Sequence, residues 1–94
     1  MIGSQWKNAS GIYPVKSIPI ADLVFGVSRP LKWWAEHPEH RKVFEEIRES
    51  IKTEGLKKPL EVKRTNKGLV VEVGNQRLQA LLDLGITTAP CIIT

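Results

Sequence analysis

The sequence is poor in cysteine and contains no long hydrophobic run. Its 94 residues include a single cysteine, Cys91, which has no partner for an internal disulfide, and no CxxC pair that would hold a structural zinc ion. No apolar run approaches the roughly 20 residues that span a bilayer, and no signal-peptide core is visible. We therefore expect a cytoplasmic protein with no membrane partner and no metal site, in which Cys91 is a small core residue rather than a reactive thiol.

The remaining composition is that of an ordinary globular domain, with 41% hydrophobic and 26% charged residues. The net charge of +4 is unevenly distributed, because residues 55–77 contain six of the 14 basic side chains and only two of the ten acidic ones. This bias favours an anionic partner, either a nucleotide or a nucleic acid, although lysines also decorate exposed strands for solubility. The candidates for nucleic-acid contact are Lys57, Lys58, Lys63, Arg64 and Lys67.

Hydrophobic periodicity predicts the element order β-α-β-β-α-β. Residues 11–23 are interpreted as a strand and its exit, and residues 24–34 as a loop. A helix is predicted over 38–54, with Val43, Phe44, Ile47 and Ile51 on one apolar stripe and Gly55 at its end. Strands 60–64 and 69–73 are predicted to form a hairpin. A helix follows over 75–84 with Leu78, Leu81 and Leu82 facing inward and Ala80 as a further candidate, and then a last strand over 91–93.

This order predicts an α+β fold with a small mixed β-sheet and two main helices. We expect residues 1–10 to be a loose N-terminal segment and residues 11–94 to be a single domain.

Gly74 marks the point where the apolar run 69–73 becomes a helical pattern. Asn75, Gln76 and Arg77 follow it in the first helical turn, where a helix presents unpaired N–H groups and a positive dipole end. Such a corner is suited to holding a phosphate. Two simpler interpretations stay open: Gly74 is an ordinary turn glycine, and Arg77 is a surface residue paired with Glu72 or Asp83.

Three segments stand in a characteristic order: Ser28-Arg29-Pro30, then GLKKPLEV at 55–62, then GNQRLQA at 74–80. This succession resembles the ParB N-terminal domain and the wider ParB/sulfiredoxin superfamily over residues 15–93. The resemblance implies the same small mixed sheet with two main helices. GLKKPLEV is similar to the first sequence box of that family, and GNQRLQA is similar to its second box. The resemblance also implies a nucleotide pocket in which the second box binds a triphosphate and the first box lies against the base and ribose.

Carried over by position, the resemblance assigns Gly74 to close backbone approach and Arg77 to phosphate binding. Asn75 and Gln76 stand where ParB has Glu and Arg, and they offer amide groups without charge. Lys57 or Lys58 would restore some of that charge, and Arg29 matches the arginine of the family's early region. Gly55, Leu56 and Pro59 complete the first box. The implied ligand is CTP, ATP or ADP, with or without Mg²⁺.

Departures from the family pattern argue against catalysis. Sulfiredoxin-like members have a catalytic cysteine where this sequence has Asn75, so peroxiredoxin-type sulfinic acid reduction is not expected. Kinase-like relatives have an acidic residue directly before the glycine, where this sequence has Val73, and histidines after it, where it has Asn75 and Gln76. The sequence therefore leans away from an enzyme.

Three functional hypotheses follow. The first is a non-catalytic nucleotide-binding module linked to DNA partition or transcription regulation. The second is a nucleotide-dependent phosphotransferase or nuclease of the same superfamily. The third is a nucleic-acid-binding or protein-docking domain whose pocket has decayed.

The wider setting of these 94 residues stays open. Full ParB proteins continue into a helix-turn-helix domain and a dimerisation domain, so residues 1–94 are expected to lack site-specific DNA recognition by that route. Both a fragment and a minimal protein are compatible with the sequence, as are a protein partner and a homodimer. Two interpretations of Trp33 and Trp34 are open. Either one fills the core while the other covers the loop, or one is exposed as a surface for stacking on a base or for contact with a protein. His37 and His40 are read either as solvated residues or as metal or acid–base groups.

Overall fold

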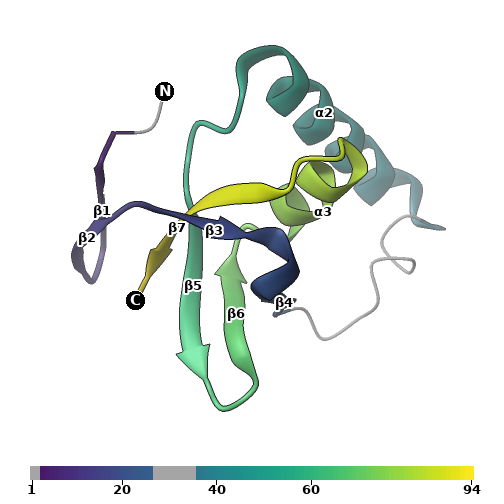
Figure 1. Cartoon of the computed structure of the whole chain (residues 1–94). Coiled ribbons are helices and arrows are strands. Elements are labelled where there is room, and N and C mark those ends of the chain that lie inside the picture. The colour runs from purple at the N-terminus through teal and green to yellow at the C-terminus, as the bar shows by residue number, and fades with distance from the viewer. Residues whose placement is uncertain (1–2, 27–35) are drawn as a thin grey trace.

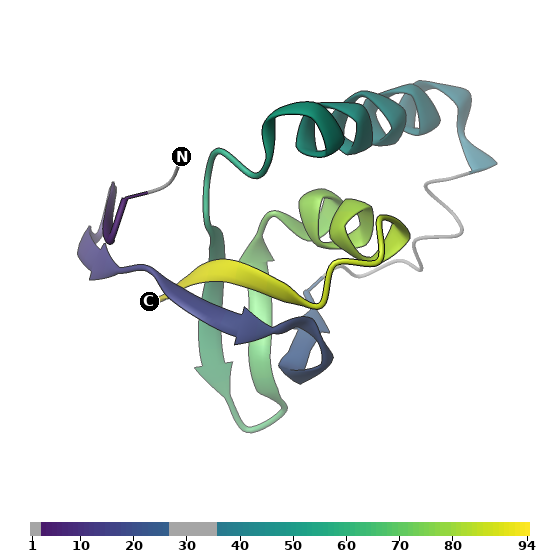
Figure 2. The same ribbon diagram turned by 45° about the horizontal axis from the view of Figure 1, so that its top comes forward.

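A computed structural model of the chain describes residues 3–26 and 36–94. Over this part the chain has the predicted α+β fold, with two helices on one side of a mixed β-sheet (Figure 1). Helix α2 (Pro38–Glu54) has the predicted bounds, and α3 (Asn75–Asp83) ends one residue before the prediction. Figure 2 shows α3 lying between α2 and the sheet.

The main sheet has five strands in the order β3-β7-β5-β6-β4. The predicted hairpin is confirmed, since β5 (Leu60–Thr65) and β6 (Gly68–Val73) pair antiparallel. Strand β7 (Thr88–Ile93) begins three residues before the predicted strand and pairs parallel with β5 and antiparallel with β3 (Lys16–Pro19). At the other edge, β4 (Leu23–Phe25) pairs parallel with β6.

The segment expected to be one strand over 11–23 is divided. It forms β2 (Gly11–Pro14), β3 and the short 3₁₀ helix η1 (Ile20–Asp22), before β4 begins at Leu23. Pro14 and Pro19 stand at the ends of β2 and β3, because proline has no N–H to continue a ladder.

Strand β4 lies partly inside the segment that was expected to be a loop, so that expectation was wrong for residues 24 and 25. Its three residues gain their ladder only from β6, more than 40 residues later in the chain. Local periodicity cannot reveal such a pairing, because a run of three apolar residues shows no period.

Residues 5–8 also differ from the expected loose segment. They form β1 (Gln5–Asn8), which pairs antiparallel with β2 and places the half-buried Trp6 opposite Tyr13. The side chain of Asn8 donates a hydrogen bond of 2.7 Å from Nδ2 to Glu61 Oε1 on β5. An aromatic cross-strand pair and this bond together order the N-terminal hairpin.

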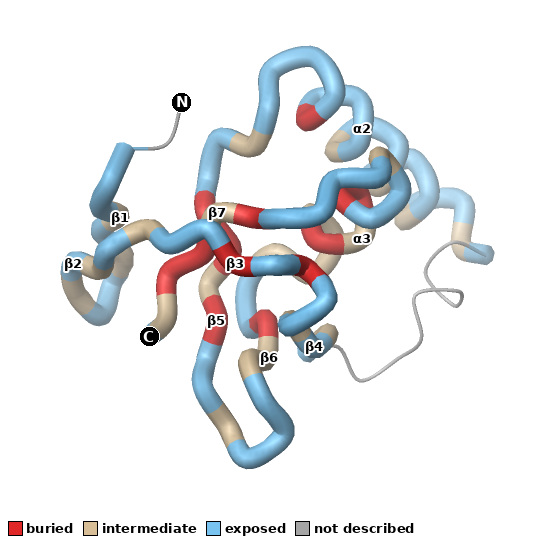
Figure 3. The backbone as a smooth tube through the Cα atoms, in the orientation of Figure 1, coloured by how far each residue is buried: buried red, intermediate tan, exposed pale blue. Residues whose placement is uncertain are grey.

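The buried residues gather where β5, β6 and β7 meet α3 (Figure 3). Cys91 is fully buried, as predicted, and this burial raises the pKa of its thiol to about 11. Leu78, Leu81 and Ala80 are buried as predicted, whereas Leu82 was predicted to face inward but is 43% exposed. The stripe of α2 is buried only at Ile51, and Val43 is exposed. Figure 2 shows the N-terminal part of α2 extending past α3.

Candidate functional site

The chain turns from β6 into α3 at Gly74, which has a φ of 102°. A Cβ atom at this position would lie 2.6 Å from Leu60 Cδ2, so both the backbone conformation and the packing require glycine. The Leu78 N–H donates to the Gly74 carbonyl at 2.8 Å and begins the helix. No side chain caps this end of α3 within the described residues, so its first N–H groups face the corner without a capping partner.

The first box meets this corner through the hairpin. Helix α2 ends at Gly55, whose φ of 78° turns the chain toward β5, and Pro59 and Leu60 are buried as β5 begins. Because β5 and β6 are antiparallel neighbours, the start of one lies beside the end of the other, and Glu61 is paired with Val73. Two motifs that are separate in the sequence therefore lie together in the fold.

Arg77 joins the two motifs directly. Its Nη1 atom donates to the carbonyl oxygens of Lys58 at 3.0 Å and Pro59 at 3.4 Å. Burial lowers the pKa of its guanidinium, and the nearby Glu61 carboxylate partly offsets that effect, yet an arginine stays charged at neutral pH. Only Nη1 is used in these bonds, so Nη2 and Nε keep donors for another partner.

The alternative of a surface ion pair for Arg77 is wrong. Within the described part of the chain neither Glu72 nor Asp83 forms an ion pair with it, and Asp83 is instead paired with Arg48 of α2 at 3.6 Å.

Asn75 has a role that the sequence did not reveal. Its Oδ1 atom accepts the Gly26 N–H at 2.9 Å, and its Nδ2 atom donates to the Val71 carbonyl at 3.0 Å. Both ends of the amide therefore bind main chain, and they tie the residue after β4 to Val71 within β6. A Cβ atom at Gly26 would lie 2.1 Å from the Val71 carbonyl oxygen, so this close approach requires glycine as well.

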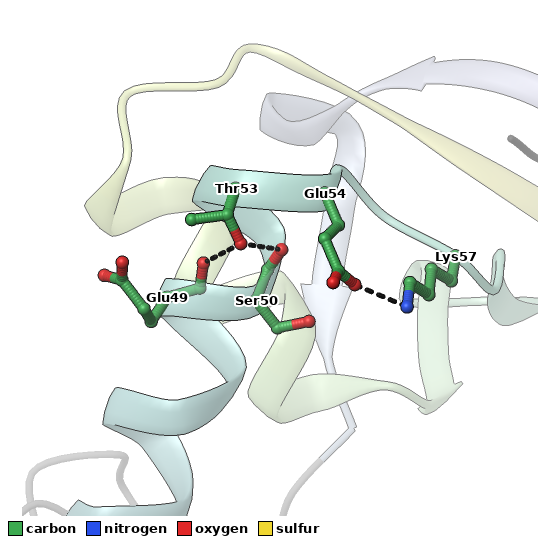
Figure 4. Close-up of polar contacts among 5 residues, drawn as sticks. All are labelled: Glu49, Ser50, Thr53, Glu54 and Lys57. Carbon is green, nitrogen blue, oxygen red and sulfur yellow. Dashed lines mark hydrogen bonds and ion pairs between the residues drawn. The ribbon is translucent and has the colours of Figure 1, made fainter.

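The two lysines of the first box differ in their surroundings. The Lys57 ammonium pairs with the Glu54 carboxylate, and the two side chains point toward one another in Figure 4. This hydrogen bond and charge lower the pKa of the exposed Glu54 carboxyl. Lys58 is exposed and forms no ion pair with any residue that the structure describes. Lys58 is therefore the lysine that is available to an anion.

These segments line a pocket of about 600 Å³. Residues 55–58 form one part of its wall, residues 74–77 form a second, and Glu46, Ile47, Ser50 and Ile51 of α2 form the third. Eight of the ten predicted nucleotide-binding positions thus lie together. Pro59 is buried beside the pocket and contributes a carbonyl to Arg77, while Arg29 lies outside the described residues.

Sequence reasoning missed Glu46 and Ser50. Their positions in the sequence could have indicated this placement. Glu46 and Ser50 lie one helical turn apart and directly precede Ile47 and Ile51 of the predicted apolar stripe.

The remaining candidates lie away from this pocket. Lys63, Arg64 and Lys67 are exposed on β5 and in its turn, toward the end of the hairpin that Figure 1 shows farthest from the helices. His37 and His40 stand at the start of α2 with ring centroids 6.1 Å apart, and the described residues contain no cluster suited to a metal ion.

Trp33 and Trp34 lie outside the described residues. No helix in the described ranges is long and apolar enough to span a membrane.

A family model described as the ParB N-terminal domain matches residues 5–94. Among solved structures, sulfiredoxin from Arabidopsis thaliana is 22% identical with a TM-score of 0.66, over 85% of this chain and 83% of that chain. The C-terminally truncated chromosome-partitioning protein ParB from Caulobacter crescentus, complexed with CTP-gamma-S, is 19% identical with a TM-score of 0.68. A free serine kinase in complex with AMP is 19% identical with a TM-score of 0.68.

These likenesses show a shared fold. This chain spans 43% of the truncated ParB and 31% of the serine kinase, whereas the matches cover 85% and 87% of its own length. A second structure of the same ParB, 20% identical with a TM-score of 0.66, is complexed to the centromeric parS site. No curated protein sequence matches the chain.

Proposed function

The chain belongs to the ParB N-terminal domain family, and on this premise we propose that it is a nucleotide-binding module that holds phosphate groups at the Gly74 corner. We further propose that it acts in the cytoplasm, in DNA partition or transcription regulation, through binding rather than turnover. Relatives of the same fold are complexed with CTP-gamma-S and with AMP, which supports a nucleotide as the ligand class.

The observation that carries this proposal is the meeting of both family boxes on one pocket. Residues 55–58 and 74–77 lie on different elements and line the same space of about 600 Å³. Small-molecule sites fall in this range of volume. A pocket with an uncapped helix N-terminus, an arginine and a lysine on its wall is chemically suited to an anionic ligand.

Each group has a distinct part in this proposal. The N–H groups at the start of α3 and the Gln76 amide would donate to phosphate oxygens, and Gly74 would allow the backbone to approach them. Arg77 would use Nη2 and Nε, because Nη1 is engaged with the first box. Lys58 would supply a second positive charge, and any Mg²⁺ would enter with the phosphates of the nucleotide.

The surroundings of two residues favour binding over thiol chemistry. Asn75, at the position of the catalytic cysteine in sulfiredoxin-like members, has both ends of its amide bound to main chain. The Cys91 thiol is buried on β7 with a raised pKa, so it is protonated at neutral pH.

Contact with nucleic acid is a second candidate function. Lys63, Arg64 and Lys67 are exposed and form no ion pair within residues 3–26 and 36–94. Cations of this kind bind phosphate backbones without reading sequence, and their contribution falls steeply with salt. This candidate predicts salt-dependent DNA binding that the Arg64→Ala variant weakens and the Gln76→Ala variant leaves unchanged.

The nucleotide proposal is tested by mapping the binding site with amide NMR spectra. CTP, ATP, ADP and GTP are titrated separately into the ¹⁵N-labelled chain. At least one should shift the amide signals of Asn75, Gln76 and Arg77, while signals of the turn at Lys67 and Gly68 stay unchanged. The proposal fails when no nucleotide shifts the corner signals at millimolar concentration, or when the shifts are confined to the β5–β6 turn.

A further inference from the structure

The wall that α2 contributes to the pocket carries two polar side chains with no assigned role. Glu46 and Ser50 are four residues apart, so they lie on the same face of the helix, one turn from each other. Both line the pocket beside the apolar side chains of Ile47 and Ile51. Neither Glu46 nor the Ser50 hydroxyl forms a side-chain hydrogen bond or ion pair with the described residues. Apart from the backbone hydrogen bonds of the helix, the Ser50 main-chain carbonyl accepts a hydrogen bond of 3.3 Å from Thr53 Oγ1 (Figure 4).

The charge of the pocket wall therefore changes sign along α2. Lys58, Arg77 and the positive end of α3 lie at the corner, whereas Glu46 is a carboxylate on the helix wall. Glu46 precedes the end of α2 at Glu54 by eight residues, which is about 12 Å along the helix axis. A carboxylate repels phosphate groups and accepts hydrogen bonds, so the end of a nucleotide that carries donors fits beside Glu46.

On the premise of the proposed nucleotide site, we propose that Glu46 and Ser50 recognise the ribose of the ligand, so that the pocket selects ribonucleotides over 2′-deoxyribonucleotides. The two adjacent hydroxyls of a ribose are donors that match the two oxygens of one carboxylate. Acidic residues bind ribose hydroxyls in the same chemical way in dinucleotide-binding folds. Ser50, which can donate or accept, lies one turn closer to the C-terminal end of α2 and lines the same pocket.

The test compares ribose and 2′-deoxyribose forms of each nucleotide by calorimetry on three proteins. These are the natural chain, Glu46→Gln, and Glu45→Gln as the matched control, because Glu45 is exposed on the same helix and does not line the pocket. The natural chain should bind the ribonucleotide at least about tenfold more tightly than the deoxyribonucleotide, as expected for a hydrogen bond to a charged group. Glu46→Gln should reduce this ratio to about twofold or less, and Glu45→Gln should leave it unchanged.

Three other results would overturn the assignment. Equal affinity for both sugar forms in the natural chain removes the ribose preference, while nucleotide binding itself stands. A Glu46→Gln variant that loses discrimination between CTP and UTP but keeps the ribose preference would place Glu46 against the base amino group. Failure of every nucleotide to bind would overturn the proposed function together with this inference.

Discussion

The Arg77 guanidinium donates a hydrogen bond of 3.0 Å to the main-chain carbonyl of Lys58, across 19 residues of sequence. This bond joins the second family box to the first. One arginine thereby joins two parts of the pocket wall, and its Nη2 and Nε donors are not used in these bonds. A loss of Arg77 should therefore affect stability and binding together, and the two effects need separate controls.

Replacing Arg77 with methionine removes the charge and donors while it keeps most of the apolar stem. We expect the free energy of unfolding to fall by about 1.5–3 kcal/mol, because the carbonyls of the exposed Lys58 and the buried Pro59 lose a charged donor. The control is Arg48→Met, which breaks an exposed ion pair with Asp83 and should cost about 0–1 kcal/mol. Urea unfolding of both variants gives the comparison, and equal losses would show that the Arg77 bonds are no more than surface contacts.

Gly74→Ala should destabilise the chain more than Gly85→Ala does. Both glycines have positive φ values, 102° and 73°, so both substitutions introduce backbone strain of about 1 kcal/mol. Only at Gly74 would the new methyl group also overlap Leu60, since nothing lies within 4 Å of a Cβ atom at Gly85. Thermal unfolding of the two variants measures the difference, and equal midpoints would argue that Leu60 moves aside without cost.

Substitutions of Asn75 and Gln76 should have different effects, the first on stability and the second on nucleotide binding. Asn75→Ala leaves the Gly26 N–H and the Val71 carbonyl without their partner, so we expect a loss of about 1–3 kcal/mol in unfolding free energy. Gln76→Ala removes a pocket-lining amide that has no hydrogen bond within the described residues, so stability should change by less than about 0.5 kcal/mol. Denaturation and nucleotide titration of both variants check this pair. A Gln76→Ala variant with unchanged affinity for a bound nucleotide would remove Gln76 from the site.

Stability should also depend on the Cys91 thiol at alkaline pH. The folded-state pKa is raised from 9.0 to about 11, so the protonated thiol favours the folded chain. This contribution is complete below about pH 9 and is lost as the pH rises through about 11, because the unfolded chain releases its proton first. Between about pH 8.5 and 10.5 the urea midpoint of the natural chain should fall more steeply than that of Cys91→Ala. Parallel slopes would show that Cys91 titrates normally.

Local sequence patterns predict much of this fold. The helix over 38–54 has an apolar stripe with a proline at its start and a glycine at its end, and the hairpin has alternating strands around a turn. The corner at Gly74 was predictable from the change of period there. Eight predicted residues meet at one pocket because the hairpin alone brings the two boxes together.

The features that were missed depend on pairings between distant segments. Strand β4 exists only through its ladder with β6, and the bond from Gly26 to Asn75 spans 49 residues. An asparagine at a helix start looks like a phosphate donor until the partner of its amide is known. The ion pair of Lys57 with Glu54, by contrast, has a three-residue spacing and could have been found in the sequence.

The most direct test of nucleotide binding at the Gly74 corner is calorimetric titration of CTP, ATP, ADP and GTP into the natural chain and into a Lys58→Ala, Gln76→Ala double variant. Neither substitution removes a contact that holds the fold, and Lys57→Ala serves as the charge control because Lys57 is engaged with Glu54. We predict a dissociation constant below about 1 mM for at least one nucleotide, weakened about tenfold or more in the double variant and little changed in Lys57→Ala. Absence of binding by all four nucleotides, or equal affinity in the double variant, would contradict the account.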